Sequence, residues 1–94
     1  MYSVNNVLTG QQAVTASSAP LNVSIAPANN ALTVTVKAAK ENTIPVYIGP
    51  AGVTTATGYE LSPGDFQTYL ISTPTLLSVV AASTGASISW LVQF

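Results

Sequence analysis

The feature that most constrains the fold of this 94-residue chain is an alternation of apolar and polar side chains with a period of two. It is clearest in residues 31–39, where every second residue from Leu32 to Ala38 is apolar and the residues between are threonine or lysine. Successive side chains of a β-strand point to opposite faces, so this pattern predicts a strand with one buried face. No window has the apolar stripe of an amphipathic helix, and the chain is therefore expected to be all-β.

Further strands are predicted where shorter runs repeat this alternation or are rich in β-branched and aromatic residues. These runs are residues 21–25, 45–48, 66–71, 76–81 and 87–94. In the last run, Trp90 is in phase with the apolar positions and is expected in the core. Leu91 interrupts the polar face of the same run, which indicates a strand that is covered on both sides.

Turn-forming residues separate these runs, at residues 26–30, 49–52, 62–65, 72–74 and 83–85. In segment 62–65, Pro63 fixes φ for the second turn position and Gly64 can supply the positive φ of the third. Short strands separated by such turns are typical of an antiparallel β-sandwich or a jelly-roll-like small barrel, here with about seven or eight strands. We expect a single β domain over residues 1–94.

The first ten residues are less regularly patterned than the rest, and their apolar positions are Tyr2, Val4, Val7 and Leu8. Two interpretations of this segment stay open. It forms an edge strand of the domain, or it is an arm that pairs with a neighbouring molecule. In both cases these four residues are candidates for an interface.

Charged side chains are scarce: two lysines and three acidic residues give a net charge of −1, and the chain has no histidine or cysteine. Two lysines are too few to neutralise a nucleic-acid backbone. The longest apolar run, residues 76–82, is much shorter than the ~20 residues that span a bilayer. We therefore expect no nucleic-acid or membrane partner, and synthesis in the cytoplasm because the N-terminus lacks a secretory signal.

Catalysis without histidine would need a pair of carboxylates or an activated nucleophile. Glu60 and Asp65 flank the turn at residues 62–65 and form the one candidate pair. The preferred interpretation is structural: one carboxylate is solvated at a strand end, and the other completes the turn through its oxygen. Isolated carboxylates without imidazole or thiolate ligands do not make a metal site. The sequence therefore predicts no enzyme, no catalytic residues, no metal site and no cofactor.

Tyr47 and Tyr59 lie at either side of a glycine-bearing loop between Gly49 and Gly58. The two rings could form a platform on which a sugar stacks. Alternatively, they could pack against the loop and leave their hydroxyls at the surface. The sequence favours the second interpretation without excluding the first.

Residues 45–65 resemble a pattern found in small β-sandwich virion proteins of tailed bacteriophages, of the head decoration, cement or head-fibre type. The matching segments are Val46-Tyr47-Ile48-Gly49, Gly52-Val53-Thr54 and Gly58-Tyr59-Glu60-Leu61-Ser62-Pro63-Gly64. The resemblance extends over about residues 43–92 and implies a β-sandwich or jelly-roll-like fold and a structural role in the virion.

From this resemblance, and because the sequence offers no catalytic or metal-binding residues, we expect a capsid decoration or cement protein that binds the major capsid protein and stabilises the head shell. It would be made in the host cytoplasm and reside on the capsid surface. A homo-oligomer is expected, with a trimer favoured, because a surface with few charges is inexpensive to desolvate. The alternative is a tail- or fibre-associated module that binds a host-surface glycan. Candidate interface residues are Tyr2, Val4, Val7, Leu8, Tyr47 and Tyr59.

Overall fold

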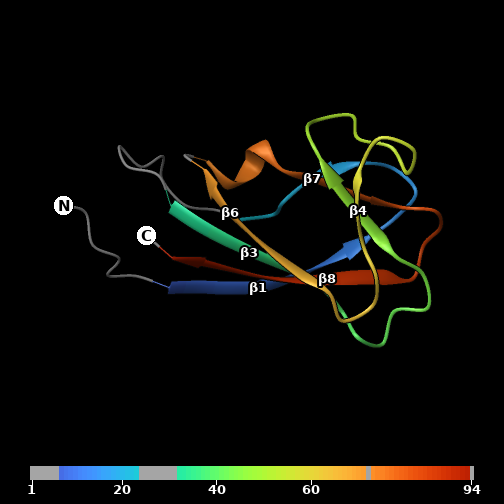
Figure 1. The fold of residues 1–94 in the computed structure, drawn as a ribbon, viewed down its shortest axis with the longest axis horizontal. Helices are drawn as coiled ribbons and strands as arrows, with labels where there is room; N and C mark the ends of the chain where they lie inside the picture. Colours follow the sequence, from blue (N-terminus) through green and yellow to red (C-terminus); the bar gives the residue numbers. More distant parts are fainter. Residues whose placement is uncertain (1–6, 24–31, 72, 94) are drawn as a thin grey trace.

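The computed structural model describes residues 7–23, 32–71 and 73–93. Within these ranges the strands form two four-stranded antiparallel sheets (Figure 1). The first, here called the long sheet, has the order β1 (Val7–Val14), β8 (Ala86–Gln93), β3 (Leu32–Ala38) and β6 (Phe66–Ile71). The second, the short sheet, has the order β2 (Ala19–Pro20), β7 (Ser78–Ala81), β4 (Val46–Gly49) and β5 (Tyr59–Leu61). The predicted all-β antiparallel sandwich is confirmed, with eight strands in the described ranges.

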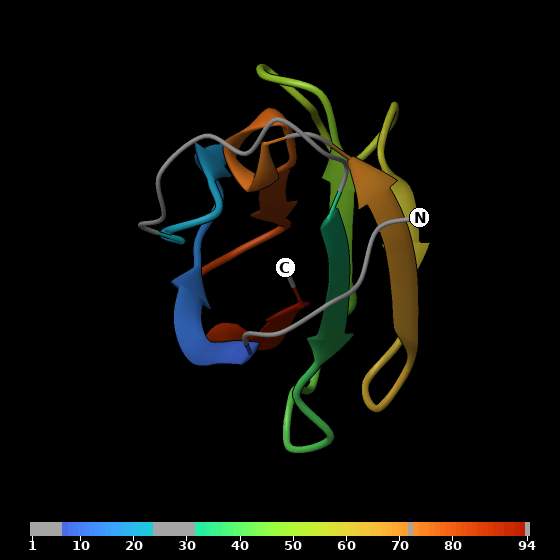
Figure 2. The ribbon, with the colours of Figure 1, turned by 90° about the vertical axis from the view of Figure 1, so that its left-hand side faces the viewer.

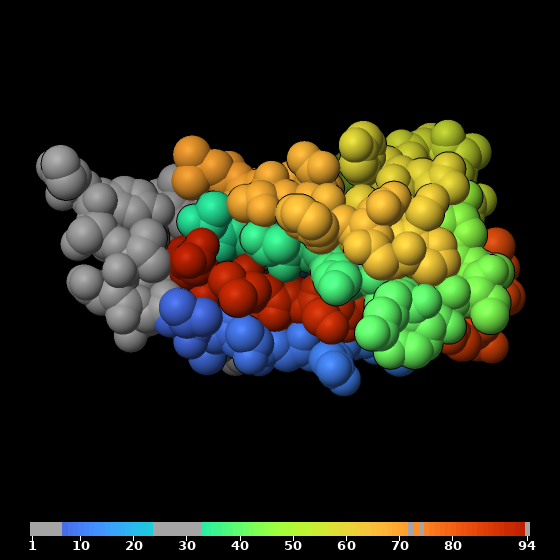
Figure 3. Space-filling model, turned by 60° about the horizontal axis from the view of Figure 1, so that its bottom comes forward, coloured from blue at the N-terminus to red at the C-terminus, as the bar shows by residue number. Residues whose placement is uncertain are grey.

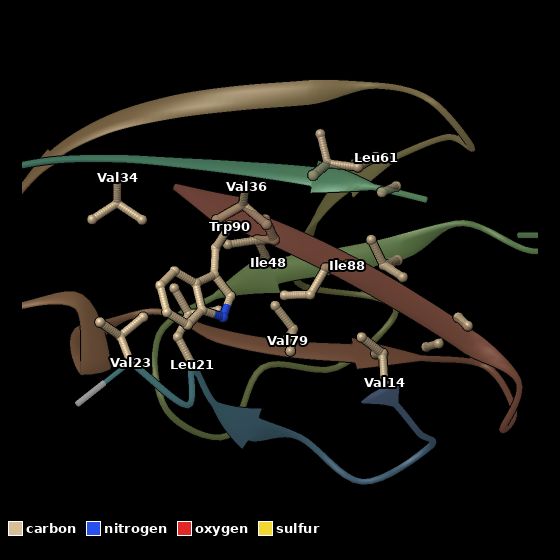
Figure 4. Packing of buried hydrophobic residues seen from close by; sticks show 14 of the residues in the cluster. Val14, Leu21, Val23, Val34, Val36, Ile48, Leu61, Val79, Ile88 and Trp90 are labelled. Atoms are coloured by element: carbon tan, nitrogen blue, oxygen red, sulfur yellow. The ribbon is translucent and has the colours of Figure 1, made fainter. Parts of the chain in front are cut away.

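The core lies between the two sheets, and the alternation seen in the sequence decides which side chains enter it (Figure 4). Along β8, buried and half-buried residues alternate strictly, and Trp90 lies on the buried side with 8% of its surface exposed. Leu91 lies on the other face of β8 and is half-buried. The buried cluster consists of Val14, Leu21, Val23, Val34, Val36, Ala38, Val46, Ile48, Leu61, Val79, Ala81, Ala86, Ile88, Trp90 and Val92.

The prediction of a strand at residues 21–25 is wrong for residues 21–23, the part of this segment that the structure describes. Leu21 and Val23 are buried as expected, but the nearby strand β2 comprises only Ala19–Pro20. The Leu21 N–H donates to Leu77 O (3.1 Å) outside the ladder, and the Asn22 N–H donates to the side-chain Oε1 of Gln12 (2.8 Å). The Asn22 N–H is thus bonded to the Gln12 side chain instead of to a neighbouring strand. The alternation in this segment correctly predicts which side chains are buried, but the backbone does not form a regular strand.

Residues 76–81 also differ from the prediction at their start. Leu76 belongs to the 3-10 turn η1 (Pro74–Leu76), in which its N–H donates to Thr73 O (3.1 Å). Strand β7 begins only at Ser78. Nothing helical in the described ranges is long or apolar enough to cross a membrane.

The N-terminal candidate residues fall on both sides of the described boundary. Val7 and Leu8 begin β1, which pairs with β8 along its whole length and lies at one edge of the long sheet. Figure 2 shows β6 on the far side of β3, at the opposite end of this sheet. Tyr2 and Val4, the turn predicted at residues 26–30, and Ile25 and Phe94 at the ends of two predicted strands lie outside the described residues.

Candidate interaction surface

The candidate carboxylate pair belongs to a turn. The Ser62 N–H donates to Asp65 Oδ2 (3.1 Å), and the Asp65 N–H donates to Ser62 O (2.8 Å). Gly64 has a φ of 89°, as the predicted turn requires. Asp65 therefore completes the turn through its carboxylate oxygen, which confirms the structural interpretation for this residue. Glu60 is exposed on β5 and lines the same hollow of about 300 Å³ as Asp65.

The other three charged residues, Lys37, Lys40 and Glu41, line a second hollow of about 340 Å³ together with Gln11, Ser87 and Ser89. Within the described ranges, no group of three or more acidic, histidine or cysteine residues is placed to hold a metal ion.

Tyr47 and Tyr59 point to opposite faces of the short sheet. In the β4–β5 ladder Tyr47 lies opposite Glu60, whereas Tyr59 lies opposite Ile48, a core residue. Directly opposed residues share a face, so Tyr47 shares the outward face with Glu60 and Tyr59 the core-facing side with Ile48. The two rings do not form one stacking surface, and the glycan alternative has no shared platform in this geometry.

The aromatic neighbour of Tyr59 is instead Tyr69 of β6. Both residues line an apolar cavity of about 260 Å³ between the open sides of the sheets, together with Ile48, Gly49, Gln67 and Leu77. The Tyr69 Oη is buried and has no hydrogen-bond partner among the described residues. Burial, and to a lesser degree the nearby Tyr59, raises the pKa of Tyr69 above its ordinary value. Sequence reasoning missed this pair because it is formed by strands of different sheets.

The outward face of the short sheet is covered by the chain itself. Val53, in the loop at residues 50–57, is only 4% exposed. It packs where Gly49 and Gly58 provide room: a Cβ at either position would come within 3.0 Å of Val53 Cγ2. Thr54 stiffens the loop, since its carbonyl accepts hydrogen bonds from the N–H groups of Thr57 (3.2 Å) and Gly58 (2.9 Å). Gly49 and Gly58 thus have a packing function in this fold.

No loop of the described residues covers the outward face of the long sheet in the same way, and the side chains of its four strands lie at the surface (Figure 3). The registers place outward residues of four strands in rows across it. One row runs Thr9, Leu91, Thr35, Thr68, and the Oγ1 atoms of Thr35 and Thr68 lie 2.9 Å apart. The hollow above its middle has a volume of about 380 Å³. This surface is called the long-sheet face below.

The long-sheet face is nearly free of charge and rich in exposed apolar side chains. Lys37 is the single charged residue in the four strands that form it. Val7, Phe66 and Leu70 are 58%, 65% and 70% exposed, and they are three of the five large hydrophobic residues that the described ranges expose. Phe66 and Leu70 lie together on β6, whereas Val7 lies on β1 at the other edge. Exposed large apolar side chains on one face favour a protein–protein contact. Of the predicted interface residues, Val7 lies on this face, whereas Leu8 is half-buried and packs against the core.

Comparison with known proteins identifies no family for this chain. No protein-family model matches it, and neither a curated protein nor a solved structure matches it. The resemblance of residues 45–65 to phage virion proteins therefore stays a prediction.

Proposed function

We propose that this chain is a structural virion protein that binds the outside of a phage head shell as a decoration or cement protein, with the major capsid protein as its partner. The observation that carries the proposal is the difference between the two sheets. The outward face of the short sheet is covered by Val53 and its loop, whereas the long-sheet face presents uncharged polar and apolar side chains. The resemblance of residues 45–65 supplies the class of partner.

Low charge suits such a surface for binding to a neighbouring protein. Ser, Thr and Gln side chains keep the face hydrated in the free protein, and their desolvation is less costly than that of ions. The exposed Phe66 and Leu70 add apolar area that association would remove from water, worth about 25 cal/mol for each Å². A shell offers many identical sites, so even an oligomer of this chain with modest contacts would bind with high avidity.

The direct test is co-sedimentation of the purified protein with undecorated capsids, followed by measurement of the heat resistance of the shell. We expect binding and a more resistant shell. Thr9→Lys places a charge on β1 at the rim of the hollow in the long-sheet face and should abolish most of the binding. Thr55→Lys, which changes an exposed threonine in the loop over the short sheet, is the matched control and should bind normally. Equal binding of both variants, or no co-sedimentation of the unmodified chain, would contradict the proposal.

A further inference from the structure

Among the residues that the structure describes, strand β6 is an open edge of the long sheet. It pairs with β3 on one side only, and its sequence Phe-Gln-Thr-Tyr-Leu-Ile contains no charge, proline or glycine. Natural sheets usually block such an edge with lysine, proline or a bulge, because exposed edge strands pair with other chains. The other edge, β1, is partly protected, since Asn22 Nδ2 donates to the carbonyl of Gln11 (3.3 Å).

The hydrogen bonds at the end of β3 show which backbone groups of β6 face outward. The Ala39 N–H donates to Ser87 O (3.1 Å), towards β8, and the Ala38 N–H donates to Asp65 O (2.9 Å), towards β6. In an antiparallel ladder the N–H and C=O of one residue point to the same side, and this side alternates along the strand. Even-numbered residues of β3 therefore bond to β6, where Val36 lies opposite Gln67 and Val34 opposite Tyr69.

The intervening residues of β6 consequently point their N–H and C=O groups away from β3. These residues are Phe66, Thr68 and Leu70, whose side chains also lie on the long-sheet face. The open edge thus combines free backbone groups with the two most exposed large hydrophobic side chains of the described ranges, at residues 66 and 70. Both features are spaced evenly about Thr68.

We propose that two copies of this chain form a two-fold dimer in which β6 pairs antiparallel with β6 of the second copy, centred on Thr68. Each Thr68 then lies opposite its counterpart, and each Phe66 lies opposite Leu70 of the other copy. In each of these three residue pairs the N–H of either residue donates to the C=O of the other, because Phe66, Thr68 and Leu70 are the residues whose backbone groups point away from β3. The two long sheets join into one sheet of eight strands.

The edge fits a second copy because it is complementary to itself in this register. A shift by one residue would place the apolar side chains of the two copies on opposite faces of the joined sheet. A shift by two residues would remove both apolar pairs between Phe66 and Leu70, because one of these side chains would then lie opposite Thr68. The contact is closed by its two-fold axis, and it therefore gives a dimer instead of the trimer favoured by the sequence. The dimer does not depend on shell binding, although it would double the long-sheet face available to a shell.

The test introduces charged residues at position 68, where the proposed two-fold axis brings the two copies together. Analytical ultracentrifugation of the unmodified chain over a wide range of concentrations should show a dimer of the 9.6 kDa chain. Thr68→Lys and Thr68→Glu should each weaken association roughly fivefold or more, because like charges then face each other. An equimolar mixture of the two variants should restore the dimer. Thr9→Lys changes the same face at the other edge strand and should leave the dimer intact, although it should abolish shell binding.

Hydrogen exchange of the unmodified chain gives a second measurement that needs no folded variant. The amides of Phe66, Thr68 and Leu70 should become protected as the concentration rises. Those of Gln67 and Tyr69 should be protected throughout, because they bond to β3. A chain that stays monomeric, a dimer that is indifferent to charge at residue 68, or concentration-dependent protection of β1 instead of β6 would overturn the proposal.

Discussion

Gly10 of β1 lies directly opposite Trp90 of β8, and a Cβ at residue 10 would stand 2.4 Å from the indole Cζ2. The glycine therefore makes the space into which the largest core side chain fits. The indole is held there by the hydrogen bond from its Nε1 to Asn22 Oδ1 (2.8 Å). Trp90 therefore connects three parts of the molecule: Gly10 on the edge strand β1, the core, and Asn22 in the segment after β2.

The first prediction follows from this contact. Gly10→Ala should lower the free energy of unfolding by about 1–3 kcal/mol, because the added methyl group overpacks the core against the indole ring. Urea unfolding measures the loss. In a double-mutant cycle with Trp90→Phe, which removes the atoms that clash, Gly10→Ala should cost much less. Equal costs in both backgrounds would show that the contact does not matter.

The second prediction concerns Asn42, whose side chain substitutes for a strand beside β8. Its Nδ2 donates to Ser87 O (2.9 Å), its Oδ1 accepts from the Ser87 N–H (3.0 Å), and the residue is 8% exposed. Asn42→Ala should destabilise the fold by about 1–3 kcal/mol, since the part-buried Ser87 N–H loses its acceptor and the Ser87 carbonyl keeps only the Ala39 N–H as a donor. The exposed neighbour Thr43 is the control, and Thr43→Ala should change stability by no more than about 0.5 kcal/mol. Similar effects of both substitutions on thermal unfolding would contradict the assigned role.

The third prediction compares two valines in different environments. Val53 is 4% exposed beneath its loop, whereas Val7 is 58% exposed on the long-sheet face. Val53→Ala should cost about 2 kcal/mol through lost burial, and it should make the loop at residues 50–57 easier to cleave by protease. Val7→Ala should leave the stability of the monomer almost unchanged. Equal stabilities of the two variants would mean that the loop is not anchored by Val53.

The sequence predicted the strands best where one face of a strand is buried along its full length. In β3 and β8 the alternation predicts both that the segment is a strand and which of its side chains point into the core. The second half of β1 was not predicted, because Gly10, Gln11 and Gln12 have low β-propensity and owe their conformation to pairing with β8. Similarly, local pattern could not reveal that Asn22 bonds to Gln12 and Trp90, which are distant partners.

The candidate surface was predicted less well than the fold, and register explains why. Tyr47 and Tyr59 are separated by an even number of positions, yet the β4–β5 ladder pairs odd-numbered with even-numbered residues, so their rings diverge. The long-sheet face depends on strand order, which joins β1, β8, β3 and β6 from distant parts of the chain. The exposed position of Val7 and the scarcity of charge are the two properties of this face that can be inferred without knowing the strand order.

The last prediction uses the buried hydroxyl of Tyr69. Its Oη lacks a hydrogen-bond partner among the described residues, so Tyr69→Phe should stabilise the fold at neutral pH by about 1 kcal/mol through removal of an unsatisfied polar group. Burial raises the pKa of Tyr69 in the folded chain above its ordinary value of 10.0. Above pH 10 the unfolded chain therefore loses this proton before the folded chain does, and the free energy of unfolding falls as the pH rises.

That decline should be smaller in Tyr69→Phe, whereas the control Tyr47→Phe keeps the Tyr69 hydroxyl and should retain it. Urea unfolding at neutral pH and at several pH values above 10 measures both effects. If Tyr69→Phe were less stable than the unmodified chain at neutral pH, the hydroxyl would have a hydrogen-bond partner in solution. An ordered water or a ligand in the cavity shared with Tyr59 would then be the partner to look for.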